Sequence, residues 1–145
     1  MARSSKLLSA IICVIFFCIF SFSCQNGEDI SDLYGQWRLE DATDDYGTSF
    51  GKDGMYLSFQ DRVACVKQVN YTSHGYQDVY AAFHQDGDSL FFHFSSNSHS
   101  ADDTTMVCRT FRFQPFTNTR LHILTESNTR LVLDDKGTCW RFIKY

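Results

Sequence analysis

Polar and apolar residues alternate along most of the chain after residue 33, which is typical of β-strands with one buried face. Trp37 and Leu39, for example, alternate with Gln36, Arg38 and Glu40. The segments with this extended, apolar-rich pattern are 37–39, 55–59, 63–71, 79–83, 90–94, 107–113, 121–125, 131–133 and 139–145. They predict about nine short antiparallel strands, and no helical stripe longer than one turn accompanies them.

Short polar segments rich in Asp, Asn and Gly separate the predicted strands. Examples are Asp44-Asp45-Tyr46-Gly47, Asp86-Gly87-Asp88 and Asp134-Asp135-Lys136-Gly137. Asp and Asn tolerate turn geometry and glycine adopts positive φ, so these segments predict tight turns between neighbouring strands. A meander of this kind buries its inner face and loses its exposed edges when it closes on itself. The sequence therefore predicts an all-β fold, a single antiparallel up-and-down β-barrel of about eight strands over residues 34–145.

Both ends of this predicted domain resemble a known family. The opening segment Tyr34-Gly35-Gln36-Trp37-Arg38-Leu39 is similar to the Gly-x-Trp strand that begins lipocalins and related barrels. The ending, from Leu131 to Phe142, resembles the closing hairpin of small lipocalin-like lipoproteins of Bacteroidetes. The resemblance spans residues 34–145 and implies a lipocalin-like barrel, often with an interior pocket for an apolar ligand.

The resemblance also implies a structural motif made of Gly35, Trp37 and an arginine near the end of the chain. Arg141 is the candidate, and its guanidinium would pack over the Trp37 ring. However, Arg141 alternates with Trp140 and Phe142, so it points to the face opposite those two aromatic residues. If Trp140 and Phe142 fill the barrel, Arg141 faces solvent or a barrel end, and both placements remain open.

The inward positions of the predicted strands are almost all aromatic or aliphatic. The candidates for lining a pocket are Leu57, Phe59, Phe92, Phe94, Phe111, Phe113, Trp140 and Phe142. His93 lies on the outer face, opposite Phe92 and Phe94. An eight-stranded barrel holds either its own side chains or one small ligand, so the interior is either filled or an apolar pocket. The polar segments 95–103 and 47–54 are the expected rim of such a pocket.

The first 23 residues have the order of an export signal. Arg3 and Lys6 precede an apolar stretch, Leu7 to Phe22, which ends at Ser23-Cys24. That stretch is shorter than the roughly 20 apolar residues of a membrane-spanning helix. A bacterial lipoprotein cleavage and an ordinary secretory cleavage both leave Cys24 as the first residue, and the former would attach lipid to it. We expect a signal peptide over 1–23, a lipidated Cys24, an acidic tether over 24–33, and an outer-membrane lipoprotein on the periplasmic or surface face.

Removing the signal makes the chain more acidic. Residues 24–145 number 122, and the loss of Arg3 and Lys6 lowers the formal net charge from −4 to −6. An acidic chain without a basic run is a poor ligand for nucleic acids or anionic membranes. The expected partners are the membrane, reached through the N-terminal lipid, and an apolar small molecule or another envelope protein.

The sequence offers no constellation for catalysis or metal binding. The histidines at 74, 84, 93, 99 and 122 lack the spacing of metal ligands, and no Gly-x-Ser-x-Gly motif is present. Cys65, Cys108 and Cys139 are far apart, and either buried thiols or one disulfide would fit them. We therefore expect neither an enzyme nor a cofactor or metal site. Two functions remain: a barrel that binds a small apolar ligand, and a filled barrel that serves as a structural or protein-interaction module.

Overall fold

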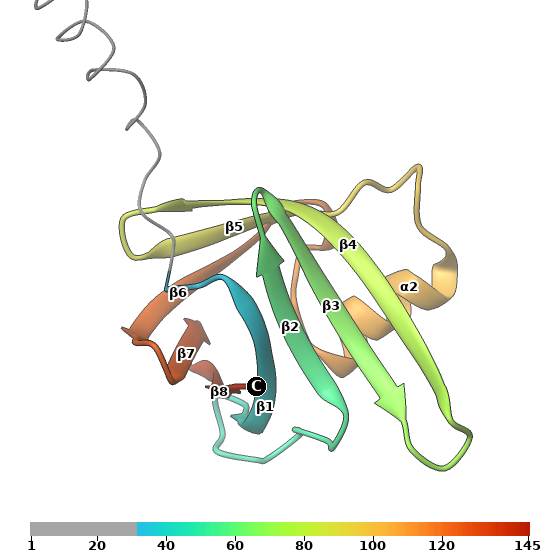
Figure 1. Ribbon diagram of the computed structural model, residues 1–145, viewed down its shortest axis with the longest axis horizontal. Helices are drawn as coiled ribbons and strands as arrows, with labels where there is room; N and C mark the ends of the chain where they lie inside the picture. The colour runs from blue at the N-terminus through green and yellow to red at the C-terminus, as the bar shows by residue number, and fades with distance from the viewer. Residues whose placement is uncertain (1–31) are drawn as a thin grey trace, which may run out of the picture.

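The protein forms a closed β-barrel in a computed structural model, which describes residues 32–145 (Figure 1). The predicted signal peptide, Cys24 and nearly all of the tether lie outside the described residues. The strands, in chain order, are β1 (Gly35–Thr43), β2 (Met55–Gln60), β3 (Val63–Asn70), β4 (Gly75–Asp86), β5 (Ser89–His93), β6 (Thr119–Glu126), β7 (Arg130–Asp135) and β8 (Thr138–Lys144).

Each strand pairs antiparallel with its neighbour in sequence, and β8 closes the barrel on β1. At the closure Trp37 lies opposite Lys144 and Asp41 opposite Arg141, with a register shift between Leu39 and Asp41. The tight turns sit where the Asp- and Gly-rich segments predicted them, as at Gly87, which has a φ of +57°. The predicted all-β up-and-down barrel is confirmed.

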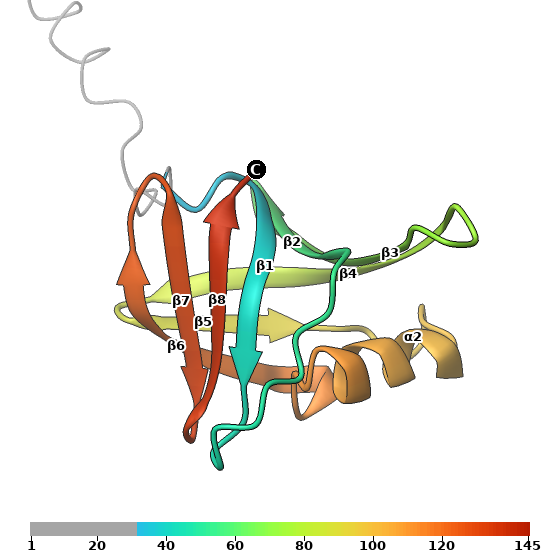
Figure 2. The same ribbon diagram turned by 90° about the horizontal axis from the view of Figure 1, so that it is seen from below.

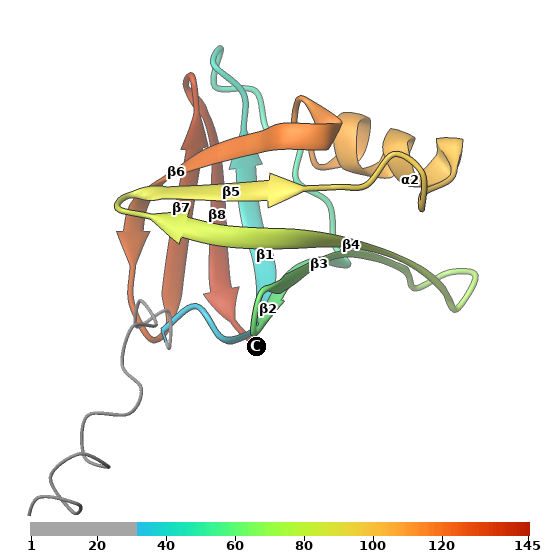
Figure 3. The same cartoon turned by 90° about the horizontal axis from the view of Figure 1, so that it is seen from above.

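The hairpin of β3 and β4 is longer than the rest of the barrel wall and projects from one side (Figure 2). Beside it lie two short helices in the connection from β5 to β6, namely α2 (Ala101–Thr105) and the π-helical turn η1 (Met106–Thr110) (Figures 2 and 3). Gln77 of β4 donates a hydrogen bond to Asp103 of α2 at 2.9 Å. This connection ends with the short 3-10 helix η2 (Phe116–Asn118).

One predicted strand, 107–113, is wrong, because Val107 to Thr110 belong to η1 and the following residues form an irregular segment. The helix begins at a capping box, in which the Ser100 hydroxyl accepts from the Asp103 backbone and the Asp103 carboxylate accepts from the Ser100 backbone. Val107 and Phe111 are four residues apart, so one side of a helix can bury both. Eight of the nine predicted extended segments are therefore strands, and the barrel has eight strands, as expected.

The core lies inside the barrel, where the alternation of the strands places the apolar side chains. Trp37, Leu57, Phe92, Leu121 and Trp140 are among the completely or almost completely buried side chains. Outward positions carry the polar residues, and His93 is exposed as predicted. Among residues 32–145, no helix is long and apolar enough to cross a membrane.

Candidate functional site

The interior of the barrel is the first candidate site, because all of the predicted lining residues lie inside it. Each of these side chains is at most 2% exposed. They are Leu57 and Phe59 on β2, Phe92 on β5, Phe94 just after β5, Phe111 and Phe113 after η1, and Trp140 and Phe142 on β8.

The aromatic rings inside the barrel are in contact with one another. The ring of Phe92 lies 6.1 Å from that of Phe59, 6.4 Å from that of Phe94 and 5.8 Å from that of Phe113, measured between centroids. Phe113 in turn meets Trp140 edge-on at 5.3 Å. These separations are those of directly packed aromatic pairs. The predicted lining residues of this cluster are thus packed directly against one another.

One expected rim segment, 47–54, and the later part of the connection after β5 contribute side chains that cover the interior. Phe50, in the loop 47–54, packs edge-on against Trp140 with centroids 6.2 Å apart. The indole Nε1 of Trp140 donates to the backbone oxygen of Phe111 at 2.8 Å, which ties the end of the helical connection to β8. Phe116 stacks on Phe94 at 5.1 Å. The connection from β5 to β6 therefore closes this end of the barrel with aromatic side chains.

The predicted structural motif is present around Trp37, with a different cation. The Trp37 indole Nε1 donates to the Leu33 carbonyl at 2.8 Å, and the Lys144 ammonium lies 4.3 Å from the Trp37 ring centroid. Arg141 instead forms an ion pair with Asp41 at 3.1 Å, on the outer side of the β1–β8 pair. Lys144 thus occupies the place over the tryptophan that the resemblance assigned to Arg141, because it is the cross-strand partner of Trp37. Gly35 has a φ of +114°, and a Cβ there would lie 3.1 Å from the Lys144 side chain.

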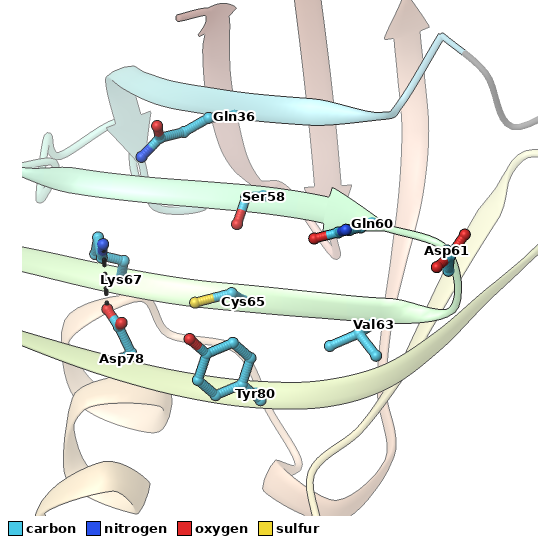
Figure 4. Close-up of a pocket in the computed structure, with 9 residues that line it drawn as sticks. All are labelled: Gln36, Ser58, Gln60, Asp61, Val63, Cys65, Lys67, Asp78 and Tyr80. Carbon is cyan, nitrogen blue, oxygen red and sulfur yellow. Dashed lines mark ion pairs between the residues drawn. The ribbon is translucent and has the colours of Figure 1, made fainter.

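A second candidate site, here called the outer groove, lies on the outside of the barrel across β1 to β4 (Figure 4). It encloses about 460 Å³. Its lining residues are Gln36, Ser58, Gln60, Asp61, Val63, Cys65, Lys67, Asp78 and Tyr80. Figure 4 shows these side chains projecting from the four strands toward the same side of the sheet.

The strand register brings the residues of the outer groove together from distant parts of the sequence. Gln36 pairs with Ser58, Ser58 with Cys65, and Cys65 with Tyr80, which forms one row across the four strands. Lys67 and Asp78 form the adjacent row. None of these residues was predicted as a site residue. Sequence reasoning identifies outward positions, but only the register shows which of them are neighbours.

Asp78 carries the most unusual polar atom of the groove. Its Oδ1 is buried and accepts no hydrogen bond among the residues that the structure describes. The Lys67 ammonium lies 3.6 Å away, within range of an ion pair but beyond that of a hydrogen bond. A buried acceptor without a donor is costly, so this atom is a point where a ligand can add an interaction.

The thiol of Cys65 is not poised for covalent chemistry. Burial, together with the negative charge of Asp78, raises the pKa of Cys65 above its usual range. The pKa of the Tyr80 hydroxyl is also raised, by the nearby Cys65 and Asp78 and by partial burial. At neutral pH both groups are therefore protonated, and a protonated thiol is a poor nucleophile. The groove offers hydrogen-bonding groups and not a catalytic nucleophile.

Among the described residues, the remaining cysteines and two surface histidines have ordinary surroundings. Cys65, Cys108 and Cys139 are all free thiols, and burial raises the pKa values of the latter two as well. Within residues 32–145, no group of three or more His, Cys, Asp or Glu side chains has the arrangement of a metal site. His84 stacks on Phe91 and His93 contacts Asn118, so these two have local partners on the barrel surface.

A second cavity, of about 500 Å³, lies between the helical connection and the β7–β8 turn. It carries Arg109, Arg112 and Lys136 beside Asp45 and Asp135. Arg112 is already engaged, because its guanidinium contacts Asp44 at 3.3 Å and lies 4.1 Å from the centroid of the Phe50 ring. The mixed charges favour no single class of ligand.

Comparison with known proteins places these features in context. Residues 17–145 match a family model described as a lipocalin-like domain. A lipocalin-like protein from Bacteroides uniformis superposes with a TM-score of 0.67 at 20% sequence identity, covering 79% of this chain and 99% of its own. An uncharacterized protein from Bacteroides eggerthii superposes with a TM-score of 0.66 at 16% identity, covering 78% and 99%. No curated protein sequence matches this chain significantly. At these identities the two structures show a shared fold.

Proposed function

Because the chain belongs to the family of lipocalin-like domains, we propose that it is a non-catalytic lipoprotein of the bacterial cell envelope. Its barrel is a filled scaffold, and it recognises its partner on the outside. The observation that carries this proposal is the contact of Phe92 with the rings of Phe59, Phe94 and Phe113, where a ligand would otherwise sit. Lipocalin-like domains are typically binding folds rather than enzymes, and the raised pKa values of the three thiols agree with that class.

Membrane anchoring through Cys24 is the second part of the proposal. It is supported by the order of basic residues, apolar stretch and Ser23-Cys24 at the N-terminus. Stable anchoring takes more than one acyl chain, and the modified cysteine of a bacterial lipoprotein carries enough. The proposed location is the outer membrane, on its periplasmic or surface face. The Bacteroides origin of both similar structures is consistent with such an envelope.

The filled interior is tested by titrating the purified protein with an environment-sensitive apolar dye while Trp fluorescence is followed. We expect no saturable binding from a protein that still melts cooperatively. Saturable one-to-one binding that Phe94→Trp or Phe113→Trp abolishes would show that the barrel holds an apolar ligand instead. That result would return the interior to the role of the functional site.

The anchor is tested by cell fractionation and by mass spectrometry of the mature N-terminus. We expect wild type in the membrane fraction with a lipidated Cys24, and Cys24→Ala in the soluble fraction. Cys65→Ala is the matched control, because it removes a thiol without touching the signal. An unmodified Cys24 in a protein that is soluble after cell breakage would contradict anchoring and leave simple secretion.

A further inference from the structure

We propose that the outer groove binds a neutral, hydroxyl-rich ligand of the carbohydrate class. This inference rests on the proposed function in one respect, that recognition uses the outside of the barrel. It adds the place of that recognition and the chemistry of the ligand. The residues that carry it are Asp78, Tyr80, Ser58 and the glutamines at 36 and 60.

The groove requires a hydrogen-bond donor from its ligand. Asp78 Oδ1 is buried without a donor, and the nearest cation, Lys67 Nζ, lies at 3.6 Å. Burial and the charge of Asp78 raise the pKa of Cys65, and the nearby Cys65 and Asp78 raise the pKa of Tyr80. Both groups are therefore protonated beside the carboxylate, yet neither donates a hydrogen bond to Oδ1. Hydrogen bonds to a charged acceptor are about twice as strong as those between neutral groups. A ligand hydroxyl that reached this oxygen would therefore gain a strong interaction.

The charges in the groove disfavour ionic ligands of either sign. An anion would meet the carboxylates of Asp61 and Asp78 in the same small volume. A cation that approached Asp78 would meet the ammonium of Lys67, which already faces that carboxylate. Desolvating a charge without full compensation is expensive. A neutral ligand avoids both penalties.

The remaining polar side chains match hydroxyl groups in both hydrogen-bonding senses. Gln36, Ser58 and Gln60 each carry a donor and an acceptor, as does each hydroxyl of a sugar. Gln36 and Ser58 are half-buried, and they are direct neighbours across β1 and β2. Because they project from hydrogen-bonded strands, their spacing is set before the ligand arrives, which lowers the entropic cost of binding.

Tyr80 and Val63 supply the apolar surface that a sugar ring also needs. The Tyr80 side chain is 55% exposed and Val63 is 45% exposed, both at the groove. A tyrosine offers a rigid flat face with a polar tip at little conformational cost. The C–H face of a pyranose can pack on such a ring while its hydroxyls point to the polar floor. A purely apolar ligand would leave the glutamines, Ser58 and Asp78 unpaired.

The test uses the full chain, purified in detergent. An array of defined neutral oligosaccharides is screened, and the strongest binder is titrated by calorimetry. We expect saturable one-to-one binding that Tyr80→Ala and Asp78→Asn each weaken at least about tenfold, a loss of about 1.4 kcal/mol. Tyr80→Phe should retain most of the affinity, because the flat face remains.

Two variants outside the groove serve as matched controls. Tyr46→Ala removes a more exposed tyrosine, at 88%, and Asp86→Asn neutralises a carboxylate that does not line the groove. Both should bind within about twofold of wild type, the usual range for a surface change away from a site. If one groove variant loses cooperative melting, the other still decides the outcome, because the two residues act independently on the ligand.

Three results would overturn the inference. These are no binding to any neutral oligosaccharide at millimolar concentration, binding that both groove variants leave intact, or equal binding of sulfated or amino sugars. Failure here is distinct from failure of the proposed function. Binding of the apolar dye inside the barrel would refute the filled scaffold, whatever the oligosaccharide array shows. If neither the dye nor any oligosaccharide binds, only the sugar site is refuted.

Discussion

Replacing Phe92 by alanine should open a cavity in the centre of the barrel. Its ring is about 1% exposed and lies 5.8–6.4 Å from the rings of Phe59, Phe83, Phe94 and Phe113. A buried Phe→Ala change costs about 3–5 kcal/mol, and more when the site cannot collapse. Here the surrounding strands are hydrogen-bonded all the way around the barrel, so we expect the upper part of that range.

The assay is thermal and urea unfolding followed by circular dichroism. At about 4 °C per kcal/mol for a domain of this size, the upper part of that range lowers the melting temperature by roughly 16–20 °C. Phe91→Ala is the matched control, because Phe91 is the next residue but is only half-buried on the outer face, stacked on His84 at 4.8 Å. It should cost about 1 kcal/mol.

The new cavity adds a second readout. An apolar cavity of this kind stays dry and takes up benzene, so benzene should raise the melting temperature of Phe92→Ala and not that of wild type. Equal melting of the Phe91 and Phe92 variants would refute the filled interior. An equal benzene effect on wild type would do so as well.

Three further predictions concern single contacts. Trp37→Phe leaves a buried backbone carbonyl without its donor, and urea unfolding should show a loss of about 1–3 kcal/mol, whereas an unchanged midpoint would place the indole at the surface. The hydrogen bond with Tyr71 at 2.7 Å, together with burial, raises the pKa of Tyr56 to about 12. Ultraviolet titration should therefore show a late tyrosine that Tyr71→Phe shifts to lower pH, and the stability this pair adds should fade as pH rises toward 12. The hydrogen bond from Gln77 lowers the pKa of Asp103, so its ionised form stabilises the fold above pH 4 and this stability is lost as the pH falls further. Asp103→Asn should therefore cost about 0.3–1 kcal/mol at pH 7 and less below pH 4, and an equal cost at both pH values would contradict this.

Much of the fold follows from alternation alone. β2 and β3 were predicted at 55–59 and 63–71 and are found at Met55–Gln60 and Val63–Asn70. In these strands most apolar side chains face the core, Val63 being the exposed exception, so pattern and burial largely agree. The tight turns are equally local, because Asp and Gly determine them within a few residues.

The helical connection could not be found from the alternating pattern alone. Val107, Phe111 and Phe113 suit a strand, but the first two also suit one face of a helix. The signal that distinguishes them is upstream, where Ser100-Ala101-Asp102-Asp103 has the spacing of a capping box. Packing against the rest of the protein then decides between helix and strand, because the helix covers the end of the barrel beyond β5.

The functional surfaces depended on register, which sequence patterns do not specify. The cation over Trp37 is Lys144 rather than Arg141 because of how β8 aligns with β1. The outer groove likewise arises where β1 to β4 place Ser58, Cys65 and Tyr80 in one row. Within their own strands, Ser58, Cys65 and Tyr80 each occupy an ordinary outward position.

The most direct measurement of the filled scaffold is a crystal structure of the protein determined under xenon pressure. Xenon occupies apolar cavities inside proteins. We predict no xenon among Phe59, Phe92, Phe94 and Phe113, with their rings in mutual contact. A xenon atom or a co-purified apolar molecule bound between these rings would contradict the filled barrel and make the interior the binding site.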